Sequence, residues 1–166
     1  MIVSMHKRVY CLLVLVFLIA CRDSQKATKL NREKIAILST SEKTFVPTDQ
    51  DLLLAERLVK ERLEVYNAEM KARNVDFAYT TGDSLQYESD TIQFEHYYRQ
   101  YTLTVNDEGD KVVAMNCLCM LNPFDKEQDS WRKNKVVVRD GGHCFFQISV
   151  NISRGIVYGF MINGLA

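Results

Sequence analysis

The second half of the chain, from Gln93 onward, consists of strand-like segments separated by short turns. Aromatic and β-branched residues dominate each segment, and such residues favour strands. The predicted strands cover residues 93–105, 111–121, 131–139, 143–152 and 156–164. Turns are predicted at NDEGD (106–110), DGG (140–142) and SRG (153–155), where glycine accepts a positive φ. Four to five consecutive strands joined in this way predict an antiparallel meander sheet.

The predicted strand 143–152 indicates that one face of this sheet is buried. Its apolar and polar residues alternate, and alternate residues of a strand project to opposite faces. The apolar set is Cys144, Phe146, Ile148, Val150 and Ile152. An antiparallel sheet with one apolar face needs another layer of structure over that face.

A helix predicted over residues 49–73 supplies this layer. Thr48 and Asp51 have the spacing of an N-terminal cap, and Asn74 is a plausible end. Apolar residues recur at steps of three and four, at Leu52, Ala55, Val59, Leu63, Tyr66 and Met70. Glu56 and Lys60 have the spacing of a surface ion pair. The predicted fold is therefore α+β, with one long N-terminal helix packed across a curved antiparallel meander. This order of elements resembles cystatin-like folds.

The N-terminus has the layout of a secretory signal. Lys7 and Arg8 precede 12 apolar residues, from Val9 to Ala20. A membrane-spanning helix needs roughly 20 such residues, so the run is too short to cross a bilayer. Its last residues, LIAC at Leu18–Cys21, resemble a bacterial lipobox. The resemblance implies cleavage before Cys21, with a diacylglyceryl group on its thiol and an acyl group on its amine.

These features divide the chain into three parts. Residues 1–20 are a predicted lipoprotein signal peptide, 21–46 are the lipidated Cys21 and a polar tether, and 47–166 form a single α+β domain. An alternative is that KIAILS, within 34–39, adds an edge strand to the sheet. Residues 75–92 are predicted to be mostly a loop. The chain has 21 basic and 21 acidic residues, so no basic surplus favours nucleic-acid binding.

Three cysteines in the predicted domain leave three alternatives open. A disulfide is predicted to join Cys144 with Cys117 or Cys119, since export permits disulfides. Buried free thiols are the favoured alternative, because cysteine is often fully buried. A zinc site is disfavoured, because His143 adjoins Cys144 and therefore points to the opposite face. We predict no metal site, no cofactor and no catalytic residue.

The segment YYRQY places Tyr97, Arg99 and Tyr101 on one face of a strand. Tyrosine and arginine are frequent at recognition surfaces, so these residues are candidates for binding. The alternative is that they pack within the fold.

The C-terminal region resembles a group of small lipoproteins from Bacteroidota. The similar residues are YRQY, MNCLC, Trp131, DGGHCFF and the closing NGLA, within residues 97–166. The resemblance implies attachment to the outer membrane, on either its periplasmic or its surface side, and implies no particular activity. We therefore expect an envelope-anchored lipoprotein that binds a protein or serves an assembly without catalysis. The alternative is a small-ligand-binding or enzymatic domain of the helix-on-sheet cone type.

Overall fold

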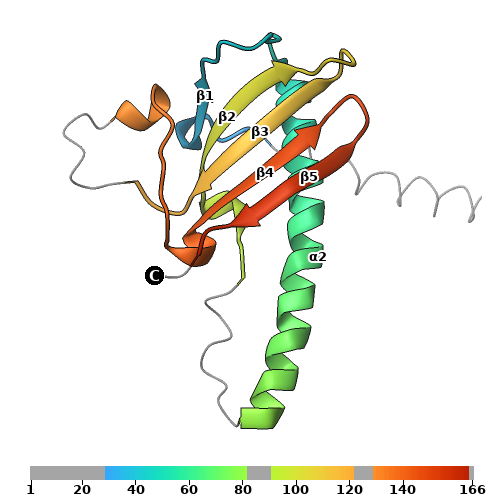
Figure 1. Cartoon of the computed structure of the whole chain (residues 1–166), viewed down its shortest axis with the longest axis vertical. Helices are drawn as coiled ribbons and strands as arrows, with labels where there is room; N and C mark the ends of the chain where they lie inside the picture. The colour runs from blue at the N-terminus through green and yellow to red at the C-terminus, as the bar shows by residue number, and fades with distance from the viewer. Residues whose placement is uncertain (1–28, 82–90, 122–128, 165–166) are drawn as a thin grey trace, which may run out of the picture.

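The computed structural model describes residues 29–81, 91–121 and 129–164. One long helix, α2 (Asp49–Thr81), lies across one face of a five-stranded sheet, as Figure 1 shows. The strands, in their spatial order, are β1 (Ile35–Leu38), β2 (Tyr98–Val105), β3 (Lys111–Leu118), β4 (Phe145–Asn151) and β5 (Ile156–Ile162). The predicted α+β class is confirmed.

Strands β2 to β5 form the predicted antiparallel meander. The turns after β2 and after β4 contain Gly109 and Gly155, with φ values of 84° and 68°. Strand β1 pairs with β2 in parallel, in the register Ile35↔Arg99 to Leu38↔Thr102. The connection from β1 to β2 contains α2, as parallel pairing requires a long crossover. The sheet is therefore mixed rather than wholly antiparallel.

The prediction of a tether up to residue 46 is wrong for residues 35–38, which form β1. The alternative of an added edge strand is confirmed. Leu30 and Ile35 belong to the hydrophobic core, so the folded domain begins well before residue 47. Burial of this apolar patch outweighs the polar composition around it. Residues 21–28 of the predicted tether lie outside the described residues.

The predicted strand at 131–139 is also wrong. Trp131 belongs to a short 3₁₀ helix, η4 (Ser130–Arg132), and residues 135–138 pair with no strand. Both edges of β3 are already occupied, by β2 and β4. An extended valine-rich segment therefore has no edge of β3 to join. The DGG sequence consequently makes no hairpin; Gly141 has a φ of 91° and leads into η5 (Gly142–Cys144).

Helix α2 begins as predicted and ends later than predicted. The Asp51 backbone N–H donates to Thr48 Oγ1 (3.1 Å), and the Thr48 backbone N–H donates to Asp51 Oδ2 (2.9 Å). These reciprocal bonds form a capping box. The helix passes Asn74, which only weakly disfavours helix, and ends at Thr81, directly before the first glycine of the chain, Gly82. Residues 75–81 of the predicted loop are thus helical, and 82–90 lie outside the described residues.

Only the first half of α2 is covered by the sheet. Leu52, Ala55, Val59 and Leu63 are at most 2% exposed and pack in one core with Tyr101, Met115, Phe146, Ile148 and Val150. The 33-residue helix is about 50 Å long, whereas an eight-residue strand spans about 27 Å. Figure 1 shows α2 extending past the end of the sheet. In the described part of the chain, no helix is both long and apolar enough to cross a membrane.

The cap of α2 should make the free energy of unfolding decrease at acid pH. The Thr48 backbone N–H holds the pKa of Asp51 below its usual value, and Lys111 Nζ, 3.2 Å from Asp51 Oδ1, lowers it further. Since the folded pKa is depressed, this stabilisation is present above the unfolded pKa of about 3.9 and is lost as the pH falls through the folded value. Urea unfolding of Asp51→Asn between neutral and acid pH should show a shallower loss of unfolding free energy than the parent chain. If the unfolding free energies of Asp51→Asn and of the parent chain fell in parallel as the pH decreased, this assignment would be contradicted.

Candidate functional site

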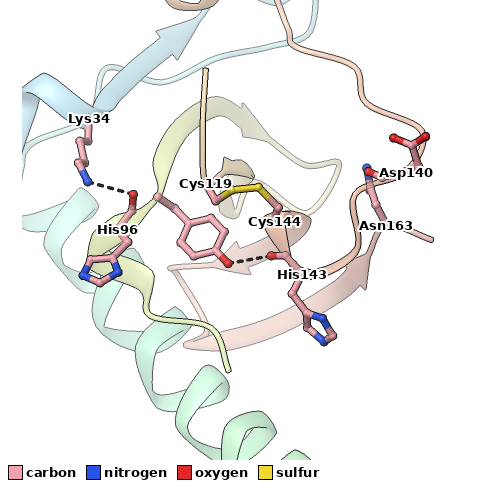
Figure 2. Close-up of a disulfide and its surroundings, with 8 residues drawn as sticks. Lys34, His96, Cys119, Asp140, His143, Cys144 and Asn163 are labelled. Carbon is pink, nitrogen blue, oxygen red and sulfur yellow. Dashed lines mark hydrogen bonds between the residues drawn. A yellow bond between two sulfur atoms is a disulfide. The ribbon is translucent and has the colours of Figure 1, made fainter. Parts of the chain in front are cut away.

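The structure joins Cys119 to Cys144 in a disulfide with a Cα–Cα distance of 4.8 Å (Figure 2). Leu118 pairs with Phe145 at the end of the β3–β4 register. The next pair of residues beyond this end is Cys119 and Cys144. Of the two predicted pairings, the structure therefore selects Cys119. The favoured alternative of three free thiols is wrong, and only Cys117, among the cysteines described, remains a thiol.

The Cys117 thiol and the two histidines of the described region, His96 and His143, have different surroundings. Burial raises the pKa of the Cys117 thiol, so it remains protonated. His143 Nε2 lies 2.6 Å from the Tyr66 hydroxyl, and Figure 2 shows the imidazole pointing away from the disulfide. His96 is exposed, and its carbonyl oxygen accepts a hydrogen bond from Lys34. Among the described residues, no cluster of His, Cys, Asp and Glu could hold a metal ion.

The three binding candidates lie in the core rather than on a surface. Tyr97, Arg99 and Tyr101 are at most 6% exposed, and they project from β2 and its preceding residue toward α2. Burial raises the pKa of Tyr97 to about 12, and its hydroxyl donates to the His143 carbonyl (2.7 Å). These residues therefore pack within the fold, which agrees with the alternative considered for them.

A buried charged pair connects α2 to β2. Glu56 does not pair with Lys60 as predicted; its Oε1 accepts from the Tyr101 hydroxyl (2.6 Å) and lies 3.6 Å from Arg99 Nε. Lys60 instead pairs with Glu95 at 2.8 Å. Burial, and then the Glu56 carboxylate, raise the pKa of Tyr101 well above its usual value. These ionisable groups contact one another in the core, where each side chain is almost fully buried, although Arg99 Nε has no hydrogen-bond partner among the described residues.

The opposite, outer face of the sheet is partly covered by residues 131–140, which we call the strap. Side-chain amides hold it in place. Gln100 Nε2 donates to the Asn134 carbonyl (2.8 Å), and Gln100 Oε1 accepts from the Val136 backbone N–H (2.9 Å). Asn116 and Asn163 donate to the Val136 and Val138 carbonyls at 2.9 and 2.6 Å. The strap, orange in Figure 1, is thus fixed to β2, β3 and the end of β5.

Two small pockets lie on either side of Lys135. One, of about 90 Å³, is lined by Gln100, Thr102, Asn116, Gln147 and Ser149 among others. The second, of about 80 Å³, also contacts Asn116, Lys135 and Gln147, and is completed by strap residues and Asn163. In the part of the chain that the structure describes, Lys135 is the only charged residue lining either pocket. The outer face therefore carries a donor-rich, positively charged site.

Beside these pockets, strand β5 exposes large apolar side chains. Tyr158 pairs with Ser149 and Met161 with Gln147, so both project to the outer face, and Ile156 does the same opposite Asn151. Each of the three is about half exposed. A shallower hollow of about 610 Å³ continues from Tyr158 to Thr104, Val112 and the turn at Asn106. The outer face thus combines a polar floor with an apolar border.

The sequence did not reveal these outer-face residues. Gln100, Asn116 and Gln147 occupy the polar positions of three adjacent strands, which is a detectable signal. Lys135 was assigned to a strand, so its position over the sheet was not foreseen.

The chain was also compared with protein-family models, with curated proteins and with solved structures, and none of these comparisons finds a match.

Proposed function

We propose that this protein is a lipoprotein of the cell envelope that binds a protein partner through the outer face of its sheet, without catalysis. In this proposal the diacylglyceryl and N-acyl groups on Cys21 anchor it to the membrane. The tether that follows Cys21 leads directly into the domain. The partner belongs to the same envelope, and the lipoprotein contributes a binding or assembly surface.

The observation that carries the proposal is the part of the outer face, along β5, that the strap leaves exposed. The inner face of the sheet is covered by α2, but Ile156, Tyr158 and Met161 remain exposed on the other side. Strand β5 has no charged residue and forms an edge of the sheet. The other edge strand, β1, is short, and Arg132 donates to the carbonyls of Ile35 and Glu33 there. Exposed apolar residues beside a free edge are typical of a surface that receives another chain.

Three features support the location. The Cys119–Cys144 disulfide is the kind of bond that forms in exported proteins. The LIAC sequence at Leu18–Cys21 follows an apolar run of the length typical of a cleaved signal. The resemblance of residues 97–166 to Bacteroidota lipoproteins points to the outer membrane, with the side of the membrane left open.

The alternative of a ligand or enzyme site between helix and sheet has less support. Ala55, Val59 and Phe146 are fully buried there and fill the space between the two layers. Of the charged groups in that region, Glu56 contacts both Arg99 and the Tyr101 hydroxyl. A cone-type cavity would need open volume with convergent polar groups at this position.

The proposal can be tested by site-specific photocrosslinking in the native cells. A photoreactive phenylalanine analogue replaces Tyr158 in the tagged full-length chain, and the control places it at Val65, which is exposed on α2. We expect a discrete crosslink to an envelope protein from position 158 and none from position 65. Fractionation of the same cells should place the protein in the membrane, and Cys21→Ser should release it or leave it unprocessed.

Two results would contradict the proposal. Equal crosslinking from positions 158 and 65, or none from either, would exclude the outer face as the binding surface. A Cys21→Ser chain that is processed to the parent size and still fractionates with the membrane would exclude the lipid anchor. The two outcomes are independent, so the anchor and the binding surface are judged separately.

A further inference from the structure

We propose that the pockets beside Lys135 bind a carboxylate of the partner, presented by an acidic peptide segment that lies on the outer face of the sheet. This inference rests on the proposed function, because it takes the ligand to be a protein. It adds a chemical class of ligand and a specific residue that recognises it. Three observations support it: the fixed backbone around Lys135, the charge and hydrogen-bonding capacity of its surroundings, and the size of the pockets.

The backbone of the strap is fixed on both sides of Lys135. The residue before it accepts from Gln100 Nε2, and the residue after it donates to Gln100 Oε1. Gln100 is only 1% exposed, so one buried carboxamide fixes the backbone around Lys135. Asn116 adds a bond to Gln100 Oε1 (2.8 Å) and one to the Val136 carbonyl (2.9 Å). A site that is ordered before binding loses less entropy when the ligand arrives.

The surroundings of Lys135 favour a negative group. Among the described residues, Lys135 forms no ion pair and no acidic side chain lines either pocket. Thr102, Gln147 and Ser149 line the pocket of about 90 Å³ and form no side-chain hydrogen bond in the described part of the chain. An ammonium, two hydroxyls and an amide can all donate to one anion. A charge-assisted hydrogen bond from Lys135 would be the strongest of these contacts.

The size of the pockets favours a side-chain carboxylate over a larger ligand. The volumes of about 90 and 80 Å³ are well below the roughly 300–1,000 Å³ of pockets that enclose a whole small-molecule ligand. The rest of the ligand must therefore lie outside them. Tyr158 and Met161, next to Ser149 and Gln147, offer an exposed apolar border for that part. The strap itself carries four basic residues and one acidic residue, which would attract an acidic segment.

The strap contains a built-in reporter for the test. Trp131 is the only tryptophan of the chain, is 5% exposed and stacks edge-on against Tyr98 at 5.4 Å. Its emission therefore follows changes at the strap.

The acylated mature protein in detergent is titrated with N-acetyl-tetraglutamate amide. N-acetyl-tetraglutamine amide tests the need for charge, and inorganic phosphate tests whether any small anion suffices.

The variants separate a local site from diffuse attraction. Lys135→Met removes the charge and keeps the chain length, and Lys135→Arg keeps the charge. Lys133→Met is the matched control, because Lys133 is an exposed strap residue that lines neither pocket. We expect saturable binding of the tetraglutamate peptide, at least tenfold weaker for Lys135→Met. Lys133→Met should stay within twofold of the parent and Lys135→Arg within about threefold.

Several outcomes would overturn the inference. The inference fails if the acidic peptide gives no response or if the glutamine peptide binds equally well. It also fails if Lys133→Met and Lys135→Met lose equal affinity for the acidic peptide. Phosphate binding as tightly as the acidic peptide would indicate a general anion site and overturn the peptide assignment. None of these results bears on crosslinking from position 158. The proposed function would fail only if that crosslink failed, so the two failures are distinguishable.

Discussion

Replacing Glu56 with alanine should lower the free energy of unfolding by about 3–5 kcal/mol, because it leaves a buried charge without its partner. Arg99 is only 2% exposed, and its Nε forms no hydrogen bond within the described residues even in the intact protein. Without Glu56, the guanidinium would retain the Phe94 carbonyl at 3.4 Å and the Phe94 ring. The Tyr101 hydroxyl would lose its acceptor as well. Urea unfolding followed by far-ultraviolet circular dichroism measures the loss.

A matched control lies five residues further along the same helix. Glu61 also pairs with an arginine, Arg57, at 3.1 Å, but both side chains are more than half exposed. Glu61→Ala should cost about 0.3–0.5 kcal/mol, as is usual for exposed pairs on a helix. The double variant Glu56→Leu with Arg99→Met removes both buried charges and should cost less than Glu56→Ala. Equal losses of unfolding free energy for Glu56→Ala and Glu61→Ala would show that the buried pair stabilises the fold no more than the exposed pair does.

The buried pair also explains why Glu56 was misassigned from the sequence. A glutamate four residues before a lysine on a helix normally indicates a surface pair. Glu56, however, follows Ala55 and precedes Val59, so it borders the buried stripe of α2. Its partner Arg99 is 43 positions away and lies on β2. A partner at this distance is set by the packing of helix on sheet, which local spacing does not encode.

Elements with strong periodicity were predicted correctly. The residues Leu52 to Leu63 recur at helical spacing, and all four predicted positions in that span are buried. The alternation from Phe146 to Val150 likewise gave the correct buried face of β4. In both cases one face of one element meets the core, so the local pattern carries the necessary information. The pockets beside Lys135 could not be predicted from a local pattern in one element, because they exist only where the strap crosses three strands.

The errors at β1 and the strap have one physical cause. Both IAIL and KVVV are short apolar segments that favour extended backbone. Which of them joins the sheet depends on which strand edges are free. The edge of β2 is open to Ile35–Leu38, whereas β3 is already paired on both sides when the strap passes over it. The strap therefore bonds to side-chain amides instead of a strand. Sequence composition does not contain the order of the strands, so it cannot decide between these outcomes.

The disulfide should be the second large contribution to stability. Cys119 and Cys144 close a loop with a sequence separation of 25, and the chain-entropy relation gives about 3.5 kcal/mol for a loop of this length. The double variant Cys119→Ala with Cys144→Ala should lose unfolding free energy of this order. The control is Cys117→Ala, which removes a thiol from the same region and leaves the disulfide intact.

Thiol titration of the acylated mature chain tests the same bond directly. Unfolded without reductant, the chain should show one reactive thiol, Cys117, since the Cys21 sulfur is a thioether in the proposed lipoprotein. After reduction it should show three, and three before reduction would contradict the disulfide. The loop that the disulfide closes contains the whole strap, including Trp131 and Lys135. Reduction should therefore shift the Trp131 emission and weaken binding of the acidic peptide, because the strap would then be held by noncovalent contacts alone, those of the amides of Gln100, Asn116 and Asn163 and of Arg132.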